Sequence, residues 1–432
     1  GQRSFVGGGQ NNTATNNHAT VGGGQNNDST SSYSTVGGGR DSTASGQYST
    51  VGGGQNNTAL GSRATVGGGE ANTANGYTAI VGGGQSNATS SNYSTVSGGQ
   101  SNTASTNTHA TVAGGSGNTA SGQSSAVGGG NTNNASGQES SVGGGSLNTA
   151  TSIRTTVGGG YNNDATSDYS TVGGGTTNTA SGDRATVGGG DNNTASALRS
   201  FVGGGEQNTA SGGNSSIVGG DANNASGDNS FIGGGLSNTS GAAQSTVSGG
   251  SSNEALGVHS TVSGGFTNRG TVNFTTISGG DTNSATALYS TISGGQNNTA
   301  SSDHSTVSGG EGNAASTNTH ATVAGGSGNT ASGQYSTVGG GTINTASGSR
   351  SIVGGGQNND AIAQLSFIGG GLDNTASGDR ATVGGGFNND ATSQFSTLSG
   401  GESNTATDTH TTVGGGSGND ATNDYSTISG GQ

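Results

Sequence analysis

Hydrophobic and polar positions follow one fifteen-residue pattern through nearly the whole chain. A large aliphatic residue occurs once in each unit, from Val6 and Val21 onward to Ile428, and we call these 29 positions the anchors. Twenty-two anchors are Val, six are Ile and one is Leu398. Self-similarity at a fixed period is the sequence signature of a repeat architecture.

Two short strands are predicted within each unit, and the stretch from Tyr48 to Ser62 illustrates them. Small or apolar residues alternate with variable ones over 49–53 (Ser-x-Val-x-Gly) and again over 57–61 (Asn-x-Ala-x-Gly). Because alternate side chains of a strand point to opposite faces, the restricted residues are predicted to point inward. A glycine-rich corner joins the two strands, and no helical periodicity competes with this interpretation.

Stacking is what makes such a unit stable, since one unit alone buries almost nothing. Each strand is expected to pair in parallel with its copy in the next unit. The predicted fold class is therefore all-β, a parallel β-solenoid or β-roll of about 29 coils. At about 4.8 Å per coil, the rod is expected to be on the order of 140 Å long. A disordered low-complexity chain is the alternative, but disorder gives no reason to keep 29 anchors in register.

One continuous solenoid domain is predicted over residues 1–432, because no linker or change of composition divides the repeats. Two coils, near 97–112 and 308–323, are each one residue longer than the others. The segments Ser105–Gln123 and Ser316–Gln334 lie in corresponding places around these longer coils and are identical in sequence. We interpret them as the remains of a duplicated block of 14 coils.

An asparagine column is predicted inside the coils. The residue six places after the anchor is Asn in 27 of 28 complete units, and Ser42 is the exception. Stacked amides can hydrogen-bond along an axis as they do in cross-β structures. We therefore expect a structural ladder rather than a glycosylation or ligand site, with representative members Asn12, Asn57, Asn102, Asn208, Asn298 and Asn404.

The outward column three residues before the anchor carries the most varied side chains. It holds all six His, seven of the nine Arg and seven of the nine Tyr. Two interpretations stay open: a stack that covers backbone, or a lateral contact stripe for sister chains or glycans. The candidate contact residues are Tyr33, Tyr48, Arg63, Tyr93, His109, Tyr169, Arg184, Arg199, His304, His320, Arg380 and Tyr425. A metal site is not expected, because the His positions alternate with Arg and Tyr and only His304 and His320 are neighbours.

Threonine forms two further outward columns. The residue before the anchor is Thr in 20 of 29 units, and the one seven places after it is Thr in 16 of 28. Regular Thr ladders on a flat sheet are one way to bind ice, although Thr is also a common strand residue. Phe, Asp, Glu254 and Arg269 interrupt the ladders, so ice binding is a secondary hypothesis.

Enzymatic chemistry is not predicted. The Gly-Gly-Gly corners lack the Gly-Lys-Ser/Thr of a phosphate loop, and the chain has no Lys. A calcium-binding repeat requires Asp at a fixed position, whereas the Asp residues of this chain are scattered over several positions of the repeat. Neither a recurring Ser/His/Asp set nor a carboxylate pair is present, so no cofactor is expected. The net charge of −14 argues against nucleic acid as a partner, and no apolar run suggests membrane insertion.

The half-repeats resemble the head repeats of trimeric autotransporter adhesins of the YadA type, as in Ala44-Ser45-Gly46-Gln47-Tyr48-Ser49-Thr50-Val51-Gly52. The resemblance extends along the whole chain and implies a left-handed parallel β-roll, a homotrimer, and a bacterial surface or phage-fibre setting. The repeat here is longer than that of the family by an extra Gly at the first corner, and no neck, coiled-coil stalk or membrane anchor is visible.

These observations predict a non-enzymatic structural protein, the shaft of an extracellular fibre, filament or surface adhesin. Self-association as a homotrimer or filament is expected. The alternative is a binding module that uses its outward columns, either the Tyr/His/Arg stripe for glycans or partner chains or the Thr ladders for ice.

Overall fold

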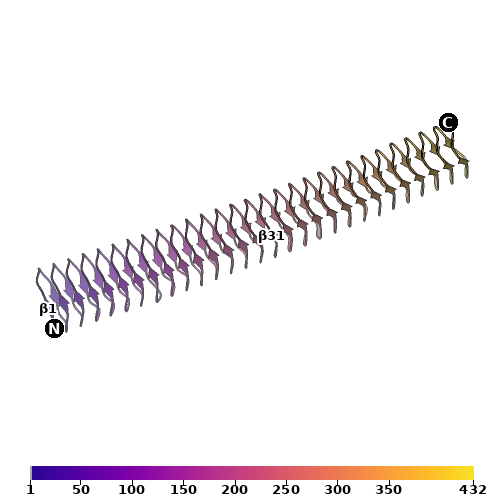
Figure 1. The fold of residues 1–432 in the computed structure, drawn as a ribbon. Coiled ribbons are helices and arrows are strands. Elements are labelled where there is room, and N and C mark those ends of the chain that lie inside the picture. Colours follow the sequence, from indigo (N-terminus) through magenta and orange to yellow (C-terminus); the bar gives the residue numbers. More distant parts are fainter. Residues whose placement is uncertain (1) are drawn as a thin grey trace. The chain divides into compact units, whose positions relative to one another are not determined.

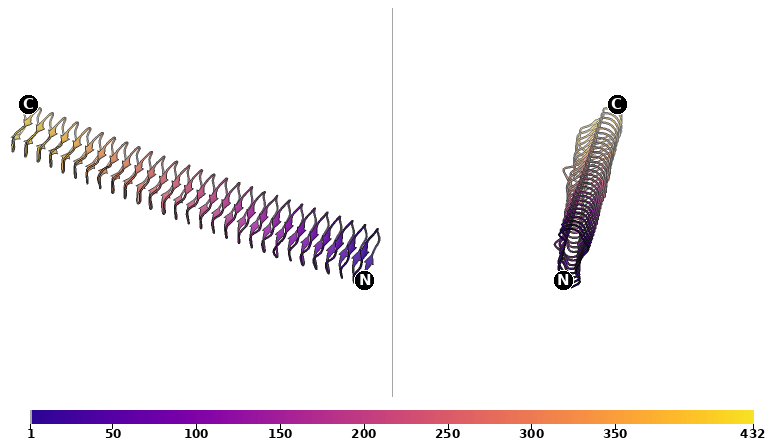
Figure 2. Two further views of the ribbon diagram at one scale, coloured as in Figure 1. Left: turned by 180° about the vertical axis from the view of Figure 1, so that it is seen from behind. Right: turned by 90° about the vertical axis from the view of Figure 1, so that its left-hand side faces the viewer.

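The computed structural model describes residues 2–432, which form two compact units, Gly1–Asn214 and Ser215–Gln432. Each unit is a stack of coils that repeat with the fifteen-residue period of the sequence (Figure 1, Figure 2). The chain makes about 28 turns with two short strands per coil, and no helix occurs among residues 2–432. The predicted all-β parallel solenoid is confirmed, whereas the single continuous domain stays a prediction.

All strands have two residues, and they alternate between two sheets. Odd-numbered strands end on an anchor, and even-numbered strands consist of the seventh and eighth residues after it. In the first unit, the odd-numbered strands run from β1 (Phe5–Val6) to β27 (Phe201–Val202), and the even-numbered strands from β2 (Thr13–Ala14) to β28 (Thr209–Ala210). In the second unit, the odd-numbered strands run from β29 (Ser216–Ile217) to β57 (Thr427–Ile428), and the even-numbered strands from β30 (Asn224–Ala225) to β56 (Asp420–Ala421).

Each strand pairs in parallel with its copy in the next coil. In the first unit, β7 (Thr50–Val51) pairs with β9 (Thr65–Val66), and β8 (Thr58–Ala59) pairs with β10 (Thr73–Ala74). The Thr50 N–H donates to the Ala64 carbonyl at 2.9 Å. Each coil therefore uses its neighbours to satisfy its backbone groups, as nearest-neighbour stacking requires.

The predicted five-residue strands are too long. Strand geometry is confined to Thr50–Val51 and Thr58–Ala59 within the predicted ranges 49–53 and 57–61. A third ladder point, which the pattern did not indicate, lies at Gln55: this residue bridges Glu70 of the next coil, and its N–H donates to the Gly69 carbonyl at 2.9 Å.

Inward and outward positions are as predicted except at Gly53, where an added Cβ would meet nothing within 4 Å and so would not face the core. Ser49, Val51, Asn57 and Ala59 are fully buried, whereas Thr50 is half-buried on the outer face of its strand. A narrow core of Val, Ala, Ser and Asn columns therefore lies between the two sheets of each unit.

One glycine of the corner is required by its backbone. Gly54 has φ +89°, and a Cβ placed on it would lie 2.1 Å from the Gly69 carbonyl oxygen. A side chain at this position is excluded both by the left-handed conformation and by the close approach of the next coil.

The two longer coils keep the register of both sheets. Val96 pairs with Val112 and Ala104 with Ala120, so the extra residue lies between the strands. It is absorbed in the turn at 105–109, where Thr106 has φ 72°. The longer coil of the second unit has the same turn, in which Thr317 has φ 70°.

Candidate interaction surfaces

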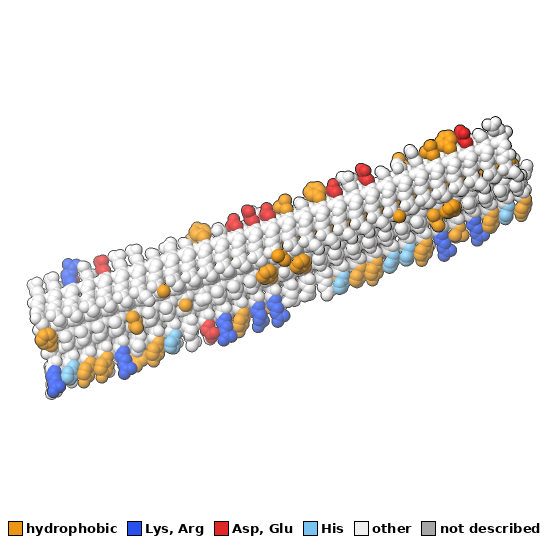
Figure 3. All heavy atoms as spheres, viewed as in Figure 1, with side chains coloured by type: hydrophobic (Ala, Val, Ile, Leu, Met, Phe, Trp, Pro, Cys, Tyr) orange, Lys and Arg blue, Asp and Glu red, His pale blue; other side chains and the backbone are white. Residues whose placement is uncertain are grey.

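The stripe three residues before the anchor lies in a tight turn at one edge of each coil, and we call this column the aromatic edge. In one coil the Ser49 N–H donates to the Gly46 carbonyl at 3.1 Å, which closes the turn, and Tyr48 has φ 60°. Within each unit, Arg, His and aromatic side chains follow one another along this edge (Figure 3). The column is thus part of a turn rather than a continuation of the strand that follows it.

This backbone conformation favours glycine, yet the aromatic edge contains none. All 29 of its residues have φ between 53° and 64°. The chain has 96 glycines, and the other column with φ near 60°, five places after the anchor, includes four of them, Gly117, Gly312, Gly328 and Gly418. A non-glycine residue costs about 1 kcal/mol in this conformation. The side chains of the aromatic edge are therefore kept at a conformational cost.

In the first unit the rings stack between neighbouring coils. The ring centroids of His18 and Tyr33 are 4.7 Å apart, and those of Tyr33 and Tyr48 are 4.9 Å apart, with the planes nearly parallel. Tyr93 and His109 stack at 5.0 Å across the first of the longer coils. These distances match the spacing of neighbouring strands, which brings equivalent side chains into face-to-face contact.

The second unit has the longer stack, six rings from consecutive coils. Its centroid distances range from 4.6 to 5.1 Å, and its members are His259, Phe274, Tyr289, His304, His320 and Tyr335. His304 and His320 lie 4.8 Å apart with nearly parallel rings. A second group joins Phe395, His410 and Tyr425.

Arginines of the aromatic edge cover ring faces. The Arg184 guanidinium lies 5.2 Å from the Tyr169 ring centroid, and that of Arg380 lies 5.1 Å from the Phe395 ring centroid. The Arg63 Nη1 donates to the Tyr77 hydroxyl at 2.8 Å. Arg199, by contrast, makes no ring contact or ion pair within the described chain. The twelve predicted contact residues thus lie on the aromatic edge of their own unit, and most of them touch a neighbour in the same column.

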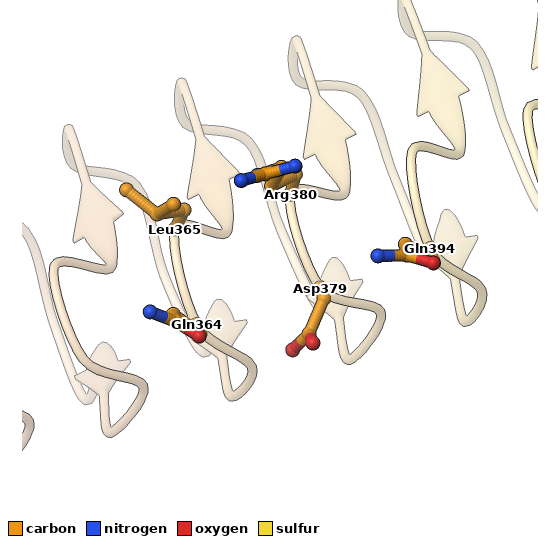
Figure 4. Close-up of a pocket in the computed structure, with 5 residues that line it drawn as sticks. All are labelled: Gln364, Leu365, Asp379, Arg380 and Gln394. Carbon is orange, nitrogen blue, oxygen red and sulfur yellow. The ribbon is translucent and has the colours of Figure 1, made fainter.

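A shallow hollow lies beside this edge in the second unit (Figure 4). Its lining residues are Gln364, Leu365, Asp379, Arg380 and Gln394. In Figure 4, Leu365 and Arg380 occupy equivalent places on neighbouring coils, and the Asp379 carboxylate points away from the Arg380 guanidinium. The hollow is a local break in the stack rather than a separate site.

The opposite edge carries acidic side chains, which sequence analysis missed. Seven of the 29 residues that lie four places after an anchor are acids, and one is an arginine, Arg40. We call this column the acidic edge, and its acids are Glu70, Asp191, Glu206, Asp221, Asp281, Glu311 and Glu402. Five further members are exposed apolar or aromatic residues: Tyr161, Leu236, Phe266, Leu372 and Phe387. Red side chains gather along the upper edge of Figure 3, away from the aromatic edge. Charges counted column by column, rather than over the whole chain, would have revealed this group of acids in the sequence.

No ion pair within the described chain neutralises the negative charge of the acidic edge. The four pairs are Arg40–Asp41, Arg154–Glu139, Arg184–Asp183 and Arg269–Glu254, and none includes an acid of this edge. Asp191 and Glu206 bridge each other through their backbones in neighbouring coils, so two like charges lie side by side. Such pairs are destabilising.

The asparagine column bonds mainly to the backbone. The Asn57 Nδ2 donates to the carbonyls of Gly53 and Gly69, both at 2.8 Å, and its Oδ1 accepts the Asn72 N–H at 3.0 Å. Asn12, Asn102, Asn298 and Asn404 repeat this arrangement, and the Asn208 amide contacts both Asn193 and Gly204. Direct hydrogen bonds between the amides of neighbouring coils, which the sequence predicted, occur in only some coils.

Two carboxyl groups have shifted pKa values. A hydrogen bond and the charge of Arg154 lower the pKa of Glu139 on the aromatic edge. Burial raises the pKa of Asp390, which lies in β52 (Asp390–Ala391) on a broad face. Neither group belongs to a cluster that could bind a metal ion, and no group of three or more His, Asp and Glu side chains suited to one occurs within residues 2–432.

Comparison of the sequence with family models and with characterised proteins found no match. The resemblance to YadA-type head repeats therefore stays a hypothesis that rests on the half-repeat motifs alone. No helix in residues 2–432 is able to span a membrane.

Proposed function

We propose that the chain is a non-enzymatic structural element, the shaft of an extracellular fibre, filament or surface adhesin. The observation that carries this proposal is the distribution of variation across the coil. Inward Val, Asn and Ala recur at the same places in coil after coil, whereas the outward columns vary. The recurring inward residues keep the coils stacked whatever the outward residues are, and a shaft needs this property.

A bacterial surface or phage-fibre location, self-association as a homotrimer or filament, and a left-handed coil belong to the same proposal. The YadA-type half-repeats support the location, the trimer and the handedness. Persistence outside a cell requires resistance to heat and proteases. Every coil supports this by satisfying its backbone N–H groups on its neighbours, as at Gly52, whose N–H donates to the Val66 carbonyl at 2.9 Å.

Thermal unfolding and protease digestion of the purified chain test the structural role, with circular dichroism and oriented fibre diffraction on the same preparation. We expect a β spectrum that persists to high temperature, slow digestion, and a reflection at about 4.8 Å along the fibre axis. A chain that is digested rapidly at room temperature would contradict the proposal.

A binding module is the second candidate, and the glycine-free turn of the aromatic edge favours it. Ring faces in the stacks cover one another, so a partner meets ring edges, hydroxyls and guanidinium groups rather than open faces. A glycan array compares the native chain with a variant carrying Tyr289→Ser, His304→Ser and His320→Ser. A glycan signal lost in this variant would favour binding over a purely structural role. Thermal hysteresis lost on replacing the Thr columns would favour ice.

A further inference from the structure

We propose that the aromatic edge of one copy docks on the acidic edge of a second copy of this chain. This inference rests on the proposed structural function and specifies how shafts associate. It follows from three features of the coil: exposed side chains on one edge, unpaired charge on the opposite edge, and a common spacing of both columns.

The aromatic edge presents a half-exposed apolar line with polar ends. Tyr33, Tyr48 and Tyr93 are each 46–48% exposed although their rings stack, and Tyr289 and Tyr335 are similar. Runs of exposed stacked rings, the longest spanning six consecutive coils, are unusual on a protein that acts alone. Because Arg and Tyr are enriched where protein surfaces meet, this edge has the composition of an interface.

Positive charge is concentrated on the same edge, and much of the surrounding negative charge is already engaged. Seven of the nine arginines lie in this column, against one acid of the column itself, Glu139. Six Asp occupy the adjacent column, but Asp183 pairs with Arg184 at 3.0 Å, and Asp168 and Asp303 accept backbone N–H bonds. With that adjacent column included the edge is close to neutral, and the positive charge lies on the arginines of the aromatic edge itself.

The acidic edge supplies the complementary charge. Six of its seven acids are exposed and Asp281 is half-buried, and none has an ion-pair partner in the described part of the chain. Two such edges would repel each other, so the acidic edge of one copy favours the opposite edge of its neighbour. Complementary potentials select partners in this way.

The two columns also match in spacing, because each has one residue per coil. Two copies of one unit aligned side by side in parallel therefore keep the same distance between successive contacts along that unit. Arg63 and Glu70 belong to one coil, as do Arg184 and Asp191, so such copies in register place these residues opposite each other. Because the contact joins different surfaces, it leaves a free edge on each side and generates an open array.

A charge-swap experiment on the full chain tests this docking. The first variant carries Arg63→Glu, Arg184→Glu and Arg199→Glu on the aromatic edge. The second carries Glu70→Arg, Asp191→Arg and Glu206→Arg on the acidic edge. The control carries Asp164→Arg, Asp360→Arg and Asp390→Arg on the broad face of the even-numbered strands, where Arg269 shows that arginine is accommodated.

Light scattering at low salt follows association, and circular dichroism of each variant establishes that it is folded. We expect the native chain and the control to associate, and association to weaken as salt screens the charges. Each edge variant alone should need a concentration at least about tenfold higher. An equimolar mixture of the two edge variants should associate again, because the reversed edges attract each other.

Three results would overturn the proposal: a native chain that keeps its single-chain mass at every concentration, an acidic-edge variant that associates like the native chain, or a mixture that fails to recover association. The second result would indicate that aromatic edges pack against each other instead. A native chain that is heat-stable but monomeric would refute the docking while leaving the structural role intact. If a reversal variant unfolds, neutral changes to Gln and Asn at the same positions replace it, with an expected weakening of about threefold.

Discussion

At the scale of single residues, nearly every coil is closed by one amide that serves three backbone groups. The Asn57 side chain donates to two glycine carbonyls and accepts one N–H, and all three partners lie at the glycine corner or in the neighbouring asparagine. Asn72 is fully buried, and a buried N–H left without an acceptor costs about 1–3 kcal/mol. Asparagine in this column thereby removes a recurrent penalty that the next coil would otherwise carry.

Ser42 is the natural gap in this column and yields the first prediction. Its hydroxyl bonds to the Arg40 carbonyl at 3.2 Å and does not bridge the two glycines of its corner. We expect Ser42→Asn to raise the free energy of unfolding by about 1–2 kcal/mol through the added hydrogen bonds. Urea unfolding measures the change, and Asn57→Ser in the next coil, which should destabilise by a similar amount, is the matched control.

Buried serines beside the core are of two kinds. The Ser49 hydroxyl has no hydrogen-bond partner, whereas the Ser170 hydroxyl donates to the Ser167 carbonyl at 2.6 Å. We expect Ser49→Ala to leave stability unchanged or higher, and Ser170→Ala to lower it by about 1 kcal/mol. Ala64 occupies the same column in the coil after Ser49. Equal effects of the two substitutions in thermal unfolding would refute this distinction.

Asp390 makes stability depend on pH. Burial raises the pKa of its carboxyl group above the value in the unfolded chain, so the folded state binds the proton more tightly. Its contribution to stability is therefore fully present in acid and is lost as the pH rises from the unfolded pKa through the folded one. We expect Asp390→Thr to be more stable than the native chain at neutral pH, with the difference shrinking as the solution is acidified. A difference that stays constant with pH would contradict this prediction.

At the scale of the coil, parity in the sequence was enough to predict the two sheets and their inward residues. Val51, Asn57 and Ala59 alternate with variable neighbours, and this alternation has only one structural explanation in a strand. The third ladder point at Gln55 has no such signal, because a single bridged residue shows no alternation. The left-handed turn at Tyr48 was hidden for a different reason: glycine, its usual marker, never occurs there.

The candidate surfaces were predictable only in part. Their side-chain types were visible in the column that contains Tyr48 and Arg63, but ring stacking depends on the close spacing of coils in three dimensions. The acidic edge could not be assigned a position, because the strand pattern says nothing of where Glu70 or Asp191 lies relative to the turn.

The glycine corner gives a prediction for the coil as a unit. We expect Gly54→Ala to unfold its own coil and those beside it, because the new Cβ meets the Gly69 carbonyl oxygen and φ is +89°. Gly53→Ala is the control, since a Cβ on Gly53 meets nothing within 4 Å and its φ lies outside the left-handed range. Hydrogen exchange should show lost protection near residue 54 only, with distant coils unchanged. Loss of protection throughout the chain would contradict nearest-neighbour stability.

At the scale of the whole molecule, we propose that the structural function arises from the repetition of one coil. The chain uses its inward positions for stacking and leaves two chemically different outward edges, one with Arg, His and Tyr and one with acids. Neighbour-only contacts make the stack extendable without any change to its core. The two edges then give a shaft a means of joining its copies side by side.

The mass of the purified chain in solution, measured by light scattering at low salt together with electron micrographs of the same sample, tests this account most directly. We predict elongated particles of uniform width whose mass exceeds that of one 40.6 kDa chain and rises with concentration. Particles that keep the mass of a single chain at every concentration would contradict a shaft that assembles through its edges.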